Sequence, residues 1–181
     1  MEKRTRTMKI ASLKFSEEEN PSFYDMKIDA MGNVYYYNEE GHLHRLDGPA
    51  VEWVNGDKEW FVNGQLHRLD GPAVETANGT KEWYQNDKLH RLDGPAVERS
   101  DGSKFWYVNN KLHRLDGPAI ELADGGKSWY VNGMHHLLDG PAIEWANGNK
   151  EWWVNNERIG ASEKGFTQED FERWKKNLIP Q

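Results

Sequence analysis

The chain contains no cysteine, so disulfide bonds and thiolate chemistry are both excluded. Only 36% of its 181 residues are hydrophobic, below the average of a globular domain, which predicts a thin core. No apolar run approaches the roughly 18 residues that a membrane-spanning helix requires, and residues 1–23 contain no apolar stretch typical of a signal peptide. We therefore expect a cytoplasmic protein with no membrane span, located in the host cytoplasm if the chain is viral.

Basic residues are also in short supply. Lys and Arg total 23 against 30 Asp and Glu, a net charge of −7, which argues against nucleic acid as a partner because binding to phosphate backbones depends on basic side chains. The chain has no G-x-S-x-G motif and no phosphate-binding glycine loop, and no serine recurs within its repeats. We expect neither a cofactor nor an enzymatic activity.

What the sequence has in abundance is an internal repeat. The heptapeptide HRLDGPA begins at His44 and returns every 23 residues, with a degenerate copy, HLLDGPA, at the fifth position. A fixed period of this length is the signature of repeat proteins. The histidine, aspartate and tryptophan columns of the repeat are His44, His67, His90, His113 and His136; Asp47, Asp70, Asp93, Asp116 and Asp139; and Trp60, Trp83, Trp106, Trp129 and Trp152.

Each repeat contains two short runs with strand composition, such as PAVEWV and KEWFV in the first, separated by Asn-Gly or Asp-Gly. Asn-Gly between β-type runs is the strongest local signal for a hairpin. A second Asn-Gly, as at Asn63-Gly64, ends the second run. The pattern predicts two antiparallel strands per repeat.

Two-residue loops fix an expected strand register. Trp60 then lies opposite His67 across the second turn, and Val51 lies opposite Trp60 across the first. Valine and tryptophan would share the buried face, with alanine and glutamate on the other face. Two cross-strand ion pairs follow, each contributing about 0.2–1 kcal/mol: Glu59 with Arg68, and Glu82 with Arg91.

Both ends of the repeat array resemble covers for exposed edges. Residues 32–47 form a half-repeat with one inserted residue, and the segment DMKID from Asp25 is expected to add an edge strand. After the last repeat, Thr167 and Asp170 have the spacing of a helix capping box, Phe166 and Phe171 occupy hydrophobic staple positions, and Pro180 follows the helix. We expect a helix to about residue 178 whose apolar stripe docks on the last hairpin, the alternative being a helix that docks a partner.

The 23-residue period, the aromatic-x-x-N-G-x-x-H run from Trp60 to His67 and the A-N-G or A-D-G turns resemble a divergent MORN repeat of the bacterial antitoxin-type variant, over roughly residues 32–159. The heptapeptide, with R-L-D-G-P where MORN repeats have an early glycine, is also similar to repeats of uncharacterised bacteriophage proteins. The resemblance implies an all-β fold, an elongated antiparallel β-hairpin array forming a single-layer sheet with a short C-terminal capping helix, and a role in scaffolding or protein binding. The expected parts are an N-terminal cap (1–31), the repeats (32–159) and the capping helix (160–181).

The recurring histidines and aspartates invite a metal or catalytic interpretation. Histidines one repeat apart lie about 10 Å from each other, too far to share an ion, and one His with one Asp makes a poor site. We therefore expect no metal site and no catalytic residue. In the favoured interpretation the aspartate caps the Asp-Gly-Pro turn, the histidine packs on tryptophan and bonds the turn, and the arginine pairs with glutamate.

The tryptophan column has two interpretations. It is expected to form the packing spine of a thin sheet, because large aromatic rings carry most of the apolar bulk. The alternative is an exposed ladder that binds a small ligand or glycan of the choline type.

A buried spine leaves the variable positions for recognition. Trp53, Arg99 and Trp145 occupy one variable column and are the candidate binding residues. The leading hypothesis is a non-enzymatic scaffold for a protein partner, in its more specific form a phage-encoded, anti-defence inhibitor that sequesters a bacterial host factor. Edge strands could also pair two copies into a homo-oligomer.

Overall fold

The structure, a computed structural model, describes residues 7–10 and 24–178. The chain divides into two compact units, Met1–Leu89 and His90–Gln181. Both consist of short antiparallel strands, and the second ends in the one α-helix of the described residues. The predicted all-β antiparallel hairpin array with a C-terminal helix is therefore confirmed.

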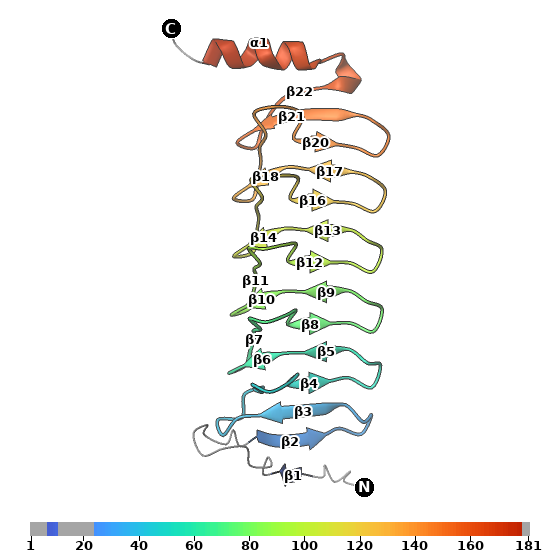
Figure 1. Cartoon of the computed structure of the whole chain (residues 1–181), viewed down its shortest axis with the longest axis vertical. Helices are drawn as coiled ribbons and strands as arrows, with labels where there is room; N and C mark the ends of the chain where they lie inside the picture. Colours follow the sequence, from blue (N-terminus) through green and yellow to red (C-terminus); the bar gives the residue numbers. More distant parts are fainter. Residues whose placement is uncertain (1–6, 11–23, 179–181) are drawn as a thin grey trace. The chain divides into compact units, whose positions relative to one another are not determined.

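In the first unit, each strand of the main ladder pairs with the one before and after it (Figure 1). Two small hairpins, β6–β7 and β10–β11, branch from this ladder. The ladder strands are β1 (Thr7–Ile10), β2 (Tyr24–Ile28), β3 (Val34–Tyr37), β4 (Val51–Glu52), β5 (Lys58–Glu59), β8 (Val74–Glu75) and β9 (Lys81–Glu82), and the hairpins are β6 (Phe61–Val62), β7 (Gln65–Leu66), β10 (Tyr84–Gln85) and β11 (Lys88–Leu89).

The second unit repeats this plan and adds the helix (Figure 1). Its ladder strands are β12 (Val97–Glu98), β13 (Lys104–Phe105), β16 (Ile120–Glu121), β17 (Lys127–Ser128), β20 (Ile143–Glu144), β21 (Lys150–Val154) and β22 (Glu157–Ala161). Its small hairpins are β14 (Tyr107–Val108) with β15 (Lys111–Leu112) and β18 (Tyr130–Val131) with β19 (Met134–His135), and the chain continues into η1 (Ser162–Lys164) and α1 (Gln168–Leu178).

The prediction of two strands per repeat is wrong, because four very short strands replace them. The break falls at the repeated tryptophan. The Trp60 N–H donates to the Ala73 carbonyl at 2.8 Å, whereas the Trp60 carbonyl accepts from the His67 N–H at 3.0 Å. One peptide group thus belongs to the main ladder and the next to the small hairpin, so the chain changes partners at this residue.

The first turn of each repeat has a three-residue loop instead of the expected two. The Trp53 N–H donates to the Asp57 carbonyl at 3.0 Å, and the Gly56 N–H donates to the Trp53 carbonyl at 2.9 Å. Gly56 has a φ of 94°, the left-handed conformation that glycine adopts without strain at such a bulge. The extra loop residue moves the register by one, so Val51 lies opposite Glu59 and its predicted pairing with Trp60 is wrong.

The second turn follows the prediction. Asn63 and Gly64 have φ angles of 50° and 80°, as a two-residue type I′ loop requires. Val62 pairs with Gln65, and the His67 N–H bonds the Trp60 carbonyl. The predicted opposition of Trp60 and His67 is therefore confirmed.

The most deeply buried column is alanine, not tryptophan. One alanine per repeat is fully buried, and Val51 beside it is 1% exposed. The shift of one residue places Ala50 instead of Val51 opposite Trp60, so the prediction that put alanine on the face away from tryptophan is wrong. The buried alanines are Ala50, Ala73, Ala96, Ala119 and Ala142.

Helix α1 begins as the capping box predicts. The Thr167 N–H and hydroxyl both donate to Asp170 Oδ2, at 3.0 and 2.7 Å, and the Asp170 N–H donates back to Thr167 Oγ1. Phe171 is fully buried and its ring stacks on Trp174. Pro180 lies outside the described residues.

The helix docks on the last repeat through aromatic contacts. The Phe166 ring lies 5.3 Å from the ring of Trp152, whose Nε1–H donates to Gln168 Oε1. A Cβ at Gly160 would overlap the Phe166 ring, so this position requires glycine. The predicted docking of the helix is confirmed.

At the other end, the predicted strand from Asp25 is confirmed as β2, which pairs with β3. Its predicted edge position is wrong, because β1 pairs with its outer side.

Enlarging a buried alanine should be costly. We expect Ala119→Leu to lower the free energy of unfolding by about 1–3 kcal/mol, because a side chain with no exposed surface has no room for three further carbons. Ala123→Leu, in an exposed turn, is the matched control and should change it by less than about 0.5 kcal/mol. Urea unfolding followed by tryptophan fluorescence measures both, and equal losses would contradict this placement of the core.

Candidate binding surface

The arginine of the heptapeptide is held from several sides. The Arg114 guanidinium carbon lies 4.0 Å from the Trp106 ring centroid. Its Nε donates to Asp116 Oδ1 at 2.9 Å, and its Nη1 donates to the Pro118 carbonyl at 3.1 Å and to Glu121 Oε1 at 2.9 Å. We call this arrangement the arginine clamp. Arg45, Arg68 and Arg91 make the same three kinds of hydrogen bond.

The clamp corrects the predicted ion pairs. Arg68 pairs with Asp70 and Glu75 instead of Glu59, because its guanidinium lies over the Trp60 ring and points toward the following strand. The carboxylate of Glu59 accepts from the Trp53 indole N–H at 3.0 Å. Arg91 likewise pairs with Asp93 and Glu98 instead of the predicted Glu82.

The glycine of the heptapeptide makes room for the clamp. A Cβ at Gly117 would lie 2.9 Å from the Arg114 guanidinium carbon. A Cβ at Gly48, Gly71 or Gly94 would likewise lie 2.8 to 2.9 Å from the guanidinium carbon of the arginine in the same heptapeptide. The degenerate repeat carries Leu137 in place of arginine, and there a Cβ at Gly140 would lie 3.6 Å from the nearest leucine atom, an ordinary contact. The requirement for glycine thus comes from the arginine.

The repeated histidine bonds the turn of the following hairpin, 19 residues on, instead of its own Asp-Gly-Pro turn. His113 Nδ1 accepts from the Asn132 N–H at 3.1 Å, and His44 Nδ1 accepts from the Asn63 N–H at 3.0 Å. His136 does the same with Asn155 at 3.2 Å. The histidine therefore ties the heptapeptide loop to the following hairpin, a structural role for the whole column.

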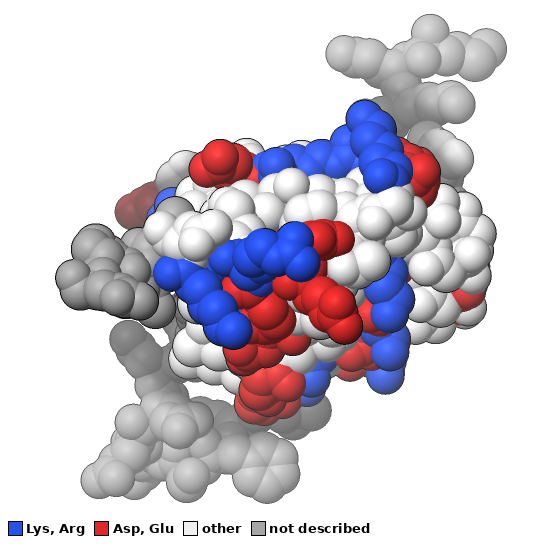
Figure 2. Space-filling model, turned by 90° about the horizontal axis from the view of Figure 1, so that it is seen from above, with Lys and Arg blue, Asp and Glu red and all other residues white. Residues whose placement is uncertain are grey.

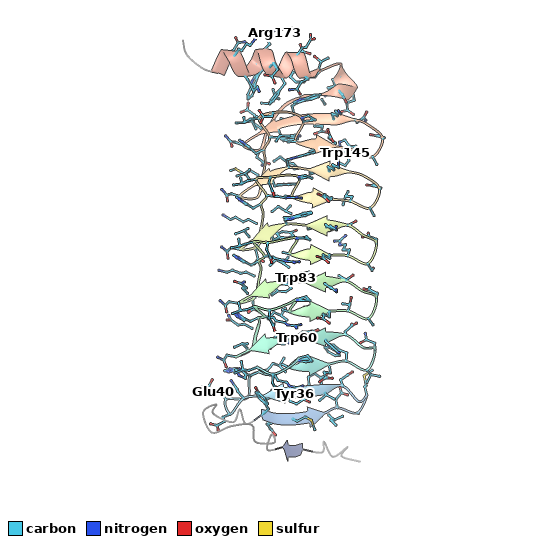
Figure 3. All side chains as sticks on the ribbon, viewed as in Figure 1. Tyr36, Glu40, Trp60, Trp83, Trp145 and Arg173 are labelled. Carbon is cyan, nitrogen blue, oxygen red and sulfur yellow. The ribbon has the colours of Figure 1, made fainter. Side chains whose placement is uncertain are left out.

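The tryptophan rings are partly buried, and Trp152 is 3% exposed. The arginine clamp covers one face of the Trp60 and Trp106 rings, so a quaternary ammonium could not sit over that face. Figure 3 labels Trp60 and Trp83 within the body of the sheet, among the strands of the first unit.

The aspartates of the heptapeptide are exposed anions. The hydrogen bond from Arg68 lowers the pKa of Asp70 below its usual value, with the arginine charge adding to the effect. Arg91 and Arg114 act in the same way on the pKa of Asp93 and Asp116. Their side chains are 84–85% exposed, so they present negative charge to solvent. On the face that Figure 2 shows, acidic and basic side chains lie next to each other, and neither sign forms a continuous face.

The leucine of the heptapeptide projects into solvent in every repeat. Leu69, Leu92 and Leu115 are 76%, 80% and 80% exposed, and Leu46 is 66% exposed. Leu138 is 47% exposed because Lys175 of α1 reaches its loop. We call these five residues the leucine ladder. In the four repeats that have the arginine, the clamp fixes the loop that carries the leucine, so the side chain is presented on a well-defined backbone.

A hollow separates the leucine-bearing loops of adjacent repeats within each unit. In the second unit it measures about 670 Å³ and lies between Leu92 and Leu115, with Trp106, Val108 and His113 among its lining residues. In the first unit the equivalent hollow, between Leu46 and Leu69, measures about 720 Å³ and is lined by the same residue types. We call each of them a notch.

Sequence reasoning missed these leucines as a surface, since the heptapeptide was interpreted as purely structural. One signal was present. A leucine recurs among turn-forming and charged residues, R-L-D-G-P, where hairpin periodicity gives it no place on the buried face.

The variable column lies at the first turns of the repeats, away from the heptapeptide loops. Trp53 and Trp145 are 36% and 49% exposed, and the Arg99 guanidinium lies 4.6 Å from the Phe105 ring centroid. Figure 3 places Trp145 beside the turn that joins β20 to β21. The structure does not gather the three candidate residues into one cluster, because Trp53 belongs to the first unit and Arg99 and Trp145 lie two repeats apart in the second.

Within the described residues, no group of three or more His, Asp or Glu side chains is arranged to hold a metal ion. Of the helices in that same part of the chain, none has the length and apolarity needed to cross a bilayer.

One histidine outside the repeated column has an unusual setting. His135 takes the position that leucine occupies in other repeats, and its ring lies 4.1 Å from that of Tyr130 and 5.3 Å from that of Trp153. Burial lowers its pKa, and this effect outweighs the hydrogen bond with Asn156 and the charge of Glu151. The ring is therefore neutral in the folded protein at neutral pH.

A methyl group added beside the clamp tests how much the clamp contributes to the stability of the fold. We expect Gly117→Ala to lower the free energy of unfolding by about 1–2 kcal/mol, because the methyl group displaces a guanidinium that is stacked and hydrogen-bonded. Gly140→Ala, beside Leu137, should change it by less than about 0.5 kcal/mol. In an Arg114→Leu background the cost of Gly117→Ala should fall to that of Gly140→Ala. A cost that persists there would show that the arginine does not impose the glycine.

The lowered pKa of His135 predicts a pH dependence with a defined sign. Below the ordinary histidine pKa of about 6.5 the unfolded chain binds a proton that the folded chain resists, so stability should fall as the pH is lowered from about 8 to about 5. His135→Leu, which restores the residue of other repeats, should flatten the profile in this range. Urea titrations across the range measure the slope, and an unchanged slope in the variant would contradict this assignment.

The chain was compared with known proteins by family and by sequence. No family model matches it, and no curated protein matches its sequence significantly. The function is therefore inferred from the geometry of the surface.

Proposed function

We propose that this protein is a non-enzymatic repeat scaffold that binds another protein along its leucine ladder. One observation carries the proposal: the same large apolar side chain projects into solvent in each repeat, 66–80% exposed in four of the five. Single exposed leucines are ordinary on protein surfaces, whereas an ordered series beside partly apolar notches is typical of an interaction site.

The other residues of the heptapeptide all have structural contacts, in contrast to the exposed leucine. Arginine stacks on the aromatic ring, aspartate accepts from arginine, glycine makes room for it, the proline carbonyl accepts from it, and alanine fills the core. Six of the seven residues of the heptapeptide, histidine included, thus have a structural role. Leucine is the one residue of the heptapeptide whose presence packing does not explain. Partner binding would give it a role.

A more specific form of the proposal follows from the likeness of the heptapeptide to bacteriophage repeats. In that form the scaffold sequesters a bacterial host protein and so inhibits a host system. The ladder would contact the sequestered protein, and the variable column of Trp53, Arg99 and Trp145 would add selectivity at the other end of the strands.

Leucine substitutions in the second unit test the proposal. The immobilised full chain should retain a protein from bacterial lysate in stoichiometric amount, and Leu92→Ser with Leu115→Ser should reduce that retention at least tenfold. Met31→Ser with Met134→Ser is the control, since these residues are also exposed, at 79% and 40%, but lie outside the ladder and the variable column. Equal retention by both double variants, or none by the wild type, would contradict the proposal.

A further inference from the structure

The two notches offer the same chemistry twice. Each has Trp and Val among its lining residues, Leu side chains from two successive loops, and Asp carboxylates from those loops. Their volumes, about 670 and 720 Å³, fall in the range of pockets that hold small ligands or peptide segments. Two leucines one repeat apart flank each notch, which favours a ligand whose apolar residues recur with that spacing.

The charge at the notch selects a basic ligand. Asp93 and Asp116 are both 85% exposed, whereas the arginines beside them are 22% exposed and have their donors engaged by the clamp. The outward-facing charge is therefore negative. A second copy of the ladder would set aspartate against aspartate, so self-association through this surface is disfavoured.

The chain itself supplies a precedent for a cation at these loops. Lys175 of α1 donates from Nζ to the Leu138 carbonyl at 2.7 Å, and Leu138 is the least exposed leucine of the ladder. The Lys175 ammonium also lies over the Phe171 ring, 5.5 Å from its centroid. The loop of Leu138 is thus contacted by a lysine that adjoins an apolar side chain.

The repeat spacing discriminates between ligand conformations. Two strands per repeat in the ladder advance about 9.6 Å, since neighbouring strands lie about 4.8 Å apart. Residues on one face of an extended strand lie about 6.8 Å apart, and residues two turns apart on a helix about 10.5 Å. One turn of polyproline II helix, three residues, advances about 9.3 Å, the closest match, and this conformation docks in aromatic-lined grooves.

We propose that the notches bind a polyproline II segment of the partner protein, with an apolar residue at every third position and lysine or arginine between them. Apolar side chains of the segment pack against the leucines of the two successive loops that flank a notch, and the basic side chains face the exposed aspartates. This inference rests on the proposed function and names the chemistry of the partner.

Fluorescence anisotropy with defined peptides on the full chain tests the inference. The probe is a fluorescein-labelled peptide of five Leu-Pro-Lys triplets. Two further peptides replace either every leucine by serine or every lysine by glutamate, so they separate the apolar and the charge requirement. A fourth is an alanine-based helix with leucine at every seventh position and the same net charge.

We expect the Leu-Pro-Lys peptide to bind at least tenfold more tightly than the other three. Its binding should weaken at least tenfold for Leu92→Ser with Leu115→Ser and stay unchanged for Met31→Ser with Met134→Ser. The substituted leucines are largely exposed, so an unchanged urea midpoint should confirm that the variants fold. Equal binding of the serine peptide, or tighter binding of the helical peptide, would overturn the inference.

The two proposals fail in distinguishable ways. If lysate protein is retained through the leucines but the Leu-Pro-Lys peptide neither binds nor competes with it, the ladder is a protein-binding surface for another ligand conformation. If the wild-type chain retains no protein, the proposed function itself is contradicted.

Discussion

The stacking of arginine on an aromatic ring is the interaction on which the repeat depends. In the Arg114 clamp, one guanidinium connects an indole face, a carboxylate two residues on, a carbonyl four residues on and a second carboxylate at the start of the next strand. Arginine suits this position better than lysine because its planar fork both stacks and donates several hydrogen bonds in fixed directions. The loop between two strands is thereby given one conformation, and the leucine within it is directed outward. The degenerate repeat, with Leu137 in place of the arginine, relies on α1 beside it, where Lys175 bonds the Leu138 carbonyl.

The core that supports these loops is thin. Its central column consists of alanines, and the largest fully buried side chains of the described residues are Phe171 and Val51. Many small links between repeats compensate. His113 accepts from the backbone of the next small hairpin, and Ser103 Oγ accepts from the Ala123 N–H at 3.0 Å, joining successive turns. In an architecture of this kind stability is approximately a sum of nearest-neighbour terms. The leucines contribute little to that sum, which leaves them available for binding.

The sequence predicts the parts of the fold that depend on local chemistry. The Asn63-Gly64 turn, the opposition of Trp60 and His67, and the capping box at Thr167 all follow from short-range rules and are found as expected. The register of the first hairpin was not predictable in the same way. Gly56 in the left-handed conformation closes either a two-residue or a three-residue loop, and the choice is made by the ladder around it.

That single residue of register also accounts for the misplaced alanine column. It determines whether valine or alanine lies opposite the tryptophan. The predicted partner of Arg68 is also wrong. Cross-strand opposition considers only the facing residue, whereas Arg68 stacks on the Trp60 ring and pairs with Glu75 beyond the next turn. The exposure of the leucines depends in turn on that clamp and is a tertiary property. Only their recurrence is visible in the sequence.

The claim that the ladder is the contact surface can be tested most directly by site-specific photo-crosslinking. Benzoylphenylalanine would be placed at residue 92 in the ladder or at residue 145 in the variable column, each in the full chain, and irradiated in bacterial lysate. The account predicts a strong, discrete crosslinked species from residue 92 that excess unlabelled chain abolishes, with a weaker one from residue 145. A discrete species from residue 145 alone would contradict it and place recognition on the variable turns.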